Sequence, residues 1–163
     1  DVSQEWVHVD AQLKPTRAAA ELVEAFGVQP CGESVTLPEF EQRDMELPTF
    51  SFQAWHTWMD PLGHVNHPMY VDFCDEALAR GAEPYGICPD DFVPVAEALT
   101  FRSGVKGRDE VHVKTRLVGR TAGGSAVFRQ AILARDSTVC VDAMVVRRLA
   151  SGFGRDLCEV FGT

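Results

Sequence analysis

The chain has 163 residues, of which 45% are apolar and 24% are charged, as in ordinary globular proteins. Its formal net charge of −9 argues against non-specific binding to DNA or to an anionic membrane, because both need a positive surface. No apolar run approaches the ~20 residues of a membrane-spanning helix, and no signal-peptide pattern is visible. The five cysteines form no CxxC pair, which favours a reduced, cytoplasmic location.

The first part of the chain, residues 1–47, is expected to form an arm and a connector. The stretch "EWVHVD" (5–10) alternates like a short strand. In "KPTRAAAELVEAFG" (14–27) the apolar residues recur at helical spacing, and Gly27 is a plausible C-cap. Prolines and the charged run "EFEQRDME" favour a connector between 28 and 48.

One strand and one long helix are predicted next. The aromatic-rich stretch "FSFQAWHTW" (50–58), bounded by prolines, favours a strand. An apolar stripe then recurs at helical spacing, formed by Tyr70, Phe73, Cys74, Ala77, Leu78 and Gly81. Pro68 suits the first helical turn, where a missing N–H costs nothing. Asn66 or His67 is the expected N-cap, and Asn66 has the better capping side chain.

Four further strands are predicted, at about 92–102, 110–118, 125–135 and 138–149, with turn signals between them. The second alternates most regularly between apolar and polar residues, as a half-buried strand does. These elements indicate an α+β domain over residues 48–150, in which an antiparallel sheet wraps one helix. Residues 151–163 form a C-terminal tail in this interpretation.

The short stretch "WMDPLGHVNHPMY" (58–70) holds the strongest chemical signal. Asp60 ends the predicted strand, and so short a loop must bring its carboxylate near the N-terminus of the helix, where unpaired N–H groups face outward. Such a carboxylate can attack a carbonyl or activate water while the N–H groups hold the oxyanion. Gly63 lets a substrate approach the backbone, and His64 and Asn66 are candidates to orient water or the carboxylate. This arrangement suits transfer of an acyl group from a thioester.

The motif "DPLGHVNHPMY", followed by "VDFCDEALAR", resembles the hot-dog thioesterases of the 4-hydroxybenzoyl-CoA thioesterase type, whose signature reads roughly D-x-x-G-H-V-N-x-x-x-Y. The resemblance implies a hot-dog fold, in which a curved antiparallel sheet wraps a long central helix, paired with a second hot-dog unit. It implies hydrolysis of acyl-CoA or acyl-carrier-protein thioesters, without a metal or other cofactor. Asp60 falls at the family's catalytic carboxylate, and His67 falls where a backbone N–H polarises the thioester carbonyl.

Two further resemblances bear on the site and on the domain organisation. The plant acyl-carrier-protein thioesterases place an Asn two residues and a His four residues after the Asp; His64 matches the second position, but Leu62 stands at the first. Their catalytic network therefore does not transfer to this chain. The stretch from "EWVHVD" to "AFG" is similar to the last strand and trailing segment of a unit in tandem hot-dog thioesterases, so the arm is either part of such a tandem or an extension of a single unit.

Simpler interpretations stand beside these. Asp60 is alternatively a turn residue, and His64 and His67 lack a third ligand for a metal. Tyr70 is a core residue by periodicity and, as a motif residue, also a substrate-binding candidate. Glu97 is either a second acid in the acyl pocket or, as we favour, part of a solvated strand face.

A locally basic stretch is the last candidate for substrate binding. It comprises Lys106, Arg108, His112, Lys114 and Arg116. The pair Lys114 and Arg116 is the candidate for holding the phosphates of CoA or of a carrier protein's phosphopantetheine, although a solvated strand face explains these residues nearly as well. Alternative functions are a hot-dog hydratase or dehydratase, and a non-catalytic acyl-binding or assembly module.

Overall fold

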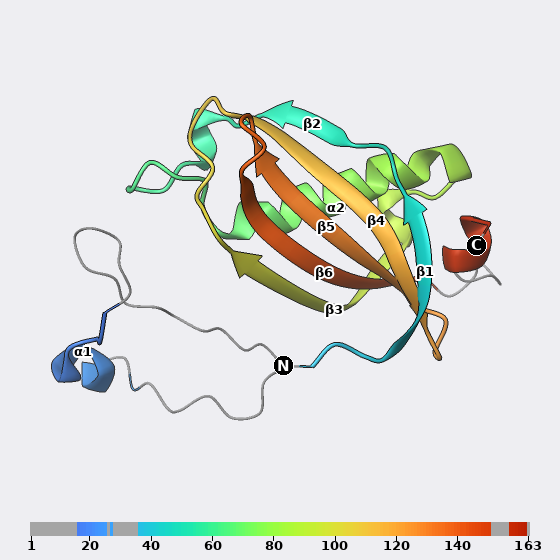
Figure 1. The fold of residues 1–163 in the computed structure, drawn as a ribbon, viewed down its shortest axis with the longest axis horizontal. Helices are drawn as coiled ribbons and strands as arrows, with labels where there is room; N and C mark the ends of the chain where they lie inside the picture. Colours follow the sequence, from blue (N-terminus) through green and yellow to red (C-terminus); the bar gives the residue numbers. More distant parts are fainter. Residues whose placement is uncertain (1–15, 26, 28–35, 151–156, 163) are drawn as a thin grey trace. The chain divides into compact units, whose positions relative to one another are not determined.

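A computed structural model of the protein describes residues 16–25, 27, 36–150 and 157–162 (Figure 1). Its elements are, in chain order, α1 (Ala20–Ala25), β1 (Phe40–Glu46), β2 (Phe50–Gln53), the 3-10 helix η1 (His56–Trp58), α2 (Pro68–Ala82), the 3-10 helices η2 (Glu83–Tyr85) and η3 (Pro89–Asp91), β3 (Phe92–Phe101), β4 (Glu110–Thr121), β5 (Ala126–Ala134), β6 (Val139–Leu149) and α3 (Leu157–Val160). The chain forms two compact units, residues 1–36 and 37–163, and the second contains the sheet and α2.

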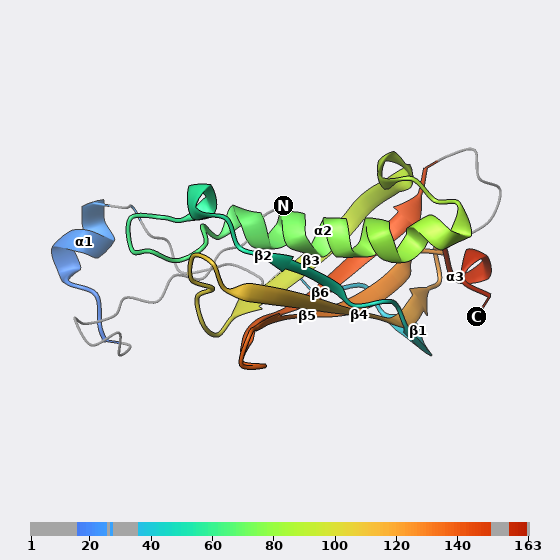
Figure 2. The same cartoon turned by 90° about the horizontal axis from the view of Figure 1, so that it is seen from above.

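The six strands form one antiparallel sheet in the order β1-β4-β5-β6-β3, and β2 pairs with the same strand as β1. β1 lies against the C-terminal half of β4 and β2 against its N-terminal half, so the two follow one another along this edge. β3 forms the opposite edge and pairs with β6 over its whole length. The sheet curves around α2, which lies along one of its faces (Figure 2). This is the hot-dog arrangement that the motif implied.

Alternation along the strands explains why this sheet buries one face against α2. In β4 the side chains of Val111, Val113, Thr115 and Leu117 are buried, and the residues between them are more exposed. On α2 the predicted apolar stripe is buried as a whole. The core therefore lies between the helix and the concave face of the sheet, with a period of two on one side and of about 3.6 on the other.

A polar clamp also joins the middle of α2 to the sheet. Gln130 on β5 is fully buried, and its Nε2 donates to the backbone oxygen of Cys74 (2.8 Å) and to Thr115 Oγ1 (3.0 Å). Because the same burial disfavours a thiolate, the pKa of the Cys74 thiol is raised to about 12. Cys74 is therefore a packing residue with an inert thiol, as its place on the apolar stripe predicted.

Some of the predicted elements need correction. The connector expected over 28–48 is wrong where Phe40–Glu46 form β1, because charged residues are tolerated on an edge strand that is largely exposed. The strand expected over 50–58 ends at Gln53, and the 3-10 helix η1 follows it. The four later strands and the helix that begins at Pro68 are confirmed to within a few residues.

The N-terminal unit is described only in part. α1 (Ala20–Ala25) confirms a helix within the expected range, though a shorter one, and Gly27 follows it with a positive φ of 56°, as a helix stop requires. The strand expected at 5–10 lies outside the described residues. The division of the chain at residues 47 and 150 stays a prediction. None of the described helices is long and apolar enough to cross a membrane.

Candidate active site

The loop between η1 and α2 folds back on itself as a tight hairpin. Met59 and Val65 form an antiparallel bridge, and the Asp60 N–H donates to the backbone oxygen of His64 (2.7 Å). Gly63 lies in the turn with φ 78°, a conformation that favours glycine. Leu62, beside it, is 79% exposed. The hairpin therefore presents a small, exposed turn directly before the helix.

The carboxylate of Asp60 is fixed by its own hairpin through one oxygen. Oδ1 accepts hydrogen bonds from the backbone N–H groups of Leu62 (2.8 Å) and His64 (3.1 Å). Within the described part of the chain, Oδ2 receives no hydrogen bond. One oxygen of Asp60 therefore stabilises the turn, as the simpler interpretation expected, and the other oxygen remains available to react with a substrate or with water.

The start of α2 offers one open backbone donor. The N–H of Asn66 donates to Trp58 O (2.9 Å), those of Met69 and Tyr70 donate to Asn66 O and His67 O, and Pro68 has none. The N–H of His67 has no partner among the described residues. This narrows the expected oxyanion donors at the helix start from Asn66 and His67 to the His67 N–H alone.

The expected side-chain cap is not formed. His67 is the N-cap residue, with helical backbone angles and no side-chain cap hydrogen bond. Its ring instead packs on Phe101, with ring centroids 4.4 Å apart. The preference for Asn66 as a capping side chain was therefore wrong: the N-cap is His67, whose backbone angles are already helical.

The connector between β3 and β4 holds the hairpin in place, a feature that sequence reasoning missed. The Val65 N–H donates to Val105 O (2.8 Å), and His64 forms a bridge with Lys106. The Val105 N–H in turn donates to the hydroxyl of Tyr70 (2.9 Å). Hydrogen bonds therefore link the Asp60 hairpin, the connector and the helix in one series.

Gly104, in the same connector, lies under the imidazole of His64. A Cβ at this position would come within 2.6 Å of His64 Cδ2 and 2.7 Å of Cγ. Gly104 has no positive φ, so the backbone itself would accept alanine. The glycine is needed for the space that His64 occupies. In the sequence, the glycine-rich stretch "SGVKG" (103–107) indicates a turn, but it does not indicate that Gly104 packs against His64.

Tyr70 was a candidate for substrate binding, and the structure places it in the core, 1% exposed. Burial raises the pKa of its hydroxyl, the Val105 N–H bond lowers it, and the nearby charges of Cys140 and Asp60 raise it. The hydroxyl thus anchors the loop, whether or not the ring also lines an acyl pocket.

Glu97 lies beside a buried arginine. Arg147 is 2% exposed, and its guanidinium binds both Glu97 and Asp75, the latter at 2.7 Å. Glu97 is therefore neither the simple solvated residue that we favoured nor an unpaired second acid. Arg147 occupies an inward position on β6 between Val145 and Leu149, and this interruption of an apolar row was a readable signal.

Lys114 and Arg116, the candidates for phosphate binding, lie away from the Asp60 hairpin. Both alternate with the buried residues of β4 and so point to the sheet face opposite α2. Arg116 forms a bidentate pair with Asp44 on β1, at 2.6 and 2.7 Å. Asp60, His64, Asn66 and His67 line neither of two clefts of the described structure, whose volumes are about 470 and 390 Å3. No group of three or more potential ligands for a metal occurs among the described residues.

Comparisons with known proteins bear on the family and the fold of the chain. A sequence profile of the thioesterase superfamily matches residues 62–147, which is more than half of the chain. The match begins two residues after Asp60, so it includes Gly63, His64, Asn66 and His67 but not the carboxylate. No curated protein matches the chain in sequence.

Solved structures show the same fold. A probable thioesterase from Bartonella henselae is 21% identical, with a TM-score of 0.59, and the match covers 68% of this chain and 96% of that one. A gentisyl-coenzyme A thioesterase is 17% identical, with a TM-score of 0.62 and coverages of 71% and 100%. A 1,4-dihydroxy-2-naphthoyl-CoA thioesterase from Synechocystis is 14% identical, with a TM-score of 0.61 and coverages of 73% and 94%. With the profile match over most of the hot-dog unit, the chain belongs to the thioesterase superfamily.

Proposed function

We propose that the protein hydrolyses an acyl thioester at the Asp60 hairpin. The observation that carries this proposal is a carboxylate with one free oxygen, close in sequence to an unpaired N–H at the start of a helix. Asp60 Oδ1 accepts two backbone hydrogen bonds, which leaves Oδ2 free, and the N–H of His67 has no partner among the described residues. A thioester carbonyl bound between them meets a nucleophile on one side and an oxyanion donor on the other.

Two routes fit this arrangement. In the first, Asp60 Oδ2 attacks the thioester carbonyl, the thiolate leaves, and water then hydrolyses the mixed anhydride to release the acid and restore the carboxylate. In the second, Asp60 takes a proton from water as that water attacks the carbonyl, and the tetrahedral intermediate then expels the thiolate to release the acid. In both, the His67 N–H binds the negative oxygen of the tetrahedral intermediate. His64, held above Gly104, is the candidate to orient the water.

The substrate proposal follows the site and the family. An acyl-CoA or acyl-carrier-protein thioester is the expected substrate, and a second copy of this chain is the expected partner. The support for the substrate is the superfamily match, and two of the similar structures are named as thioesterases of aromatic acyl-CoA compounds. Aromatic acyl-CoA thioesters are therefore the first substrates to try.

The first prediction concerns Asp60→Asn. Asparagine keeps an oxygen that can accept from Leu62 and His64, so the hairpin should survive while the free oxygen becomes an amide. We expect kcat to fall by about 10²-fold or more, because the amide is neither a base nor a nucleophile. Release of free thiol from acyl-CoA measures this.

Asp60→Ala is the matched comparison, because it removes the acceptor for the hairpin as well. It should lose stability in urea unfolding, while Asp60→Asn should not. Near wild-type turnover by Asp60→Asn would refute the assignment. Intact mass after rapid quench separates the two routes, since only the nucleophilic route leaves an acyl group on the peptide that contains Asp60.

A further inference from the structure

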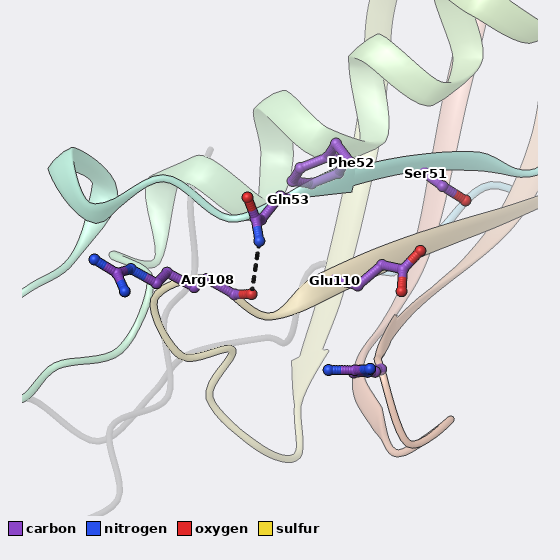
Figure 3. Close-up of a pocket in the computed structure, with 6 residues that line it drawn as sticks. Ser51, Phe52, Gln53, Arg108 and Glu110 are labelled. Atoms are coloured by element: carbon purple, nitrogen blue, oxygen red, sulfur yellow. Dashed lines mark hydrogen bonds between the residues drawn. The ribbon is translucent and has the colours of Figure 1, made fainter.

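A polar cleft lies outside the Asp60 hairpin, at the end of the sheet where β2 meets β4 (Figure 3). Its volume is about 470 Å3. It is lined by Ser51, Phe52 and Gln53 of β2, Arg108 of the β3–β4 connector, Glu110 of β4 and Arg135 of the β5–β6 turn. None of these residues has a part in the proposed hydrolysis.

The cleft carries positive charge that the structure does not neutralise. Neither Arg108 nor Arg135 forms an ion pair with a described residue, and Glu110 offsets only one of the two. Three other arginines in or beside the sheet are paired: Arg116 with Asp44, and both Arg102 and Arg129 with Asp142. In a chain with a net charge of −9, an uncompensated cationic cleft is a local exception.

The backbone at Arg108 is held in an unusual conformation. Its φ is 70°, in the left-handed region that favours glycine, although the residue carries a long side chain. The Arg108 N–H donates to Ala54 O (3.0 Å), and its carbonyl accepts from Gln53 Nε2 (3.3 Å). Figure 3 shows this hydrogen bond and the Arg108 side chain extending away from Glu110. Backbone strain of this kind clusters at functional sites, which adds to the argument from charge.

The same connector joins the cleft to the catalytic loop. Lys106, two residues before Arg108, forms the bridge with His64, and Val105 holds Val65. A ligand held at Arg108 would therefore lie on the segment that positions the hairpin. This suits one elongated substrate whose charged end and reactive end are recognised separately.

We propose that this cleft binds the phosphates of the nucleotide end of CoA, through the guanidiniums of Arg108 and Arg135. The proposal rests on the proposed thioester hydrolysis and selects CoA as the carrier. Guanidinium groups bind phosphate oxygens through paired, charge-assisted hydrogen bonds. A small cleft with two arginines suits a small polyanion, whereas an acidic carrier protein would need a broad basic face, and Arg102, Arg116 and Arg129 are already paired with acids.

The test compares two substrates that share an acyl group, its CoA thioester and its pantetheine thioester, which has no phosphate. The double variant Arg108→Ala/Arg135→Ala should raise KM for acyl-CoA about tenfold or more and leave kcat unchanged. KM for the pantetheine thioester should not change. Arg148→Ala, which removes an exposed arginine of β6 outside the cleft, is the matched control.

Binding of CoA itself, measured by titration calorimetry, gives a readout without turnover. The double variant should bind CoA more weakly, and Glu110→Gln should bind it more tightly, because it removes a like charge from the cleft. Equal KM changes for both substrates, or unchanged CoA affinity, would overturn the proposal. Preferred turnover of an acyl-carrier protein would overturn it as well. If the wild type binds CoA through these arginines but hydrolyses neither thioester, the proposed function fails and the binding site stands.

Discussion

At the scale of single residues, the site depends on small features that position Asp60 and His64. Asp60 holds its own turn with one oxygen and exposes the other. Gly104 leaves room for the imidazole of His64, and Tyr70 supplies a hydroxyl to the connector. Each of these is a positioning contact whose removal gives a distinct measurable effect.

Gly104→Ala should lower kcat about tenfold and leave KM nearly unchanged. The added Cβ would lie 2.6 Å from His64 Cδ2, so the imidazole must move. A loss of this size corresponds to about 1.4 kcal/mol of transition-state stabilisation. Steady-state kinetics on acyl-CoA checks it.

Gly123→Ala is the control, because its Cβ would meet only Thr121 Oγ1 at 3.9 Å and its φ is not positive. It should leave kcat unchanged and stabilise the fold slightly. In a His64→Ala background, Gly104→Ala should have little further effect. A full effect there would show that Gly104 acts on something other than His64.

Tyr70→Phe should destabilise the protein by about 1–3 kcal/mol, because it leaves the buried N–H of Val105 without a partner. It should also change the dependence of stability on pH. The folded pKa of Tyr70 is raised, so its contribution is complete below the unfolded value near pH ~10 and is lost as pH rises through the folded pKa.

The wild type should therefore lose more stability than Tyr70→Phe as pH rises above ~10, and the two should run in parallel below that pH, as measured by urea unfolding. Tyr85→Phe is the comparison, since Tyr85 is 42% exposed. Parallel pH profiles for the wild type and Tyr70→Phe above pH ~10 would contradict this account.

At the scale of elements, three side chains bind α2 to the free edge of the sheet. Arg147 on β6 connects Asp75 on α2 with Glu97 on β3. Arg147 is almost fully buried, whereas the side chains of Asp75 and Glu97 are 54% and 29% exposed. Arg147 is therefore the charged group that water cannot reach. Each acid can partly compensate its charge, so the free energy of unfolding should fall most when both acids are removed.

Replacing both acids, as Asp75→Asn/Glu97→Gln, should cost about 3–5 kcal/mol, because it leaves a buried guanidinium without a counter-charge. Glu97→Gln alone should cost more than Asp75→Asn alone, since water screens the more exposed pair more strongly. Asp72→Asn, an exposed acid on the same helix, should have little effect. Urea unfolding measures all four, and a harmless double variant would refute this role.

At the scale of the whole molecule, β3 leaves one edge of the sheet without a strand partner among the described residues. Val95 and Phe101 on this strand are 48% and 44% exposed, and Phe101 also contacts the ring of His67. A long apolar edge strand favours pairing with another chain. We therefore expect the active unit to be a dimer with the site close to its interface.

Light scattering should give a mass of twice 18.0 kDa for the wild type. Val95→Lys, which places a charge on the edge strand, should shift the protein toward the monomer and lower activity. Lys114→Ala, on the opposite sheet face, should change neither. A fully active monomer would rule out the need for a second copy.

The sequence by itself determined the strand–loop–helix order, the buried stripe of α2 and the alternation of β4, because periodicity of apolar residues records which side of an element is buried. It also singled out the Asp60 loop as the candidate site, since that motif is contiguous. Only the tertiary structure decided that Gly104 supports His64, that Arg147 joins Asp75 and Glu97, and that Phe40–Glu46 complete the sheet. These contacts join residues far apart in the chain, and local spacing carries no information about which distant segments meet.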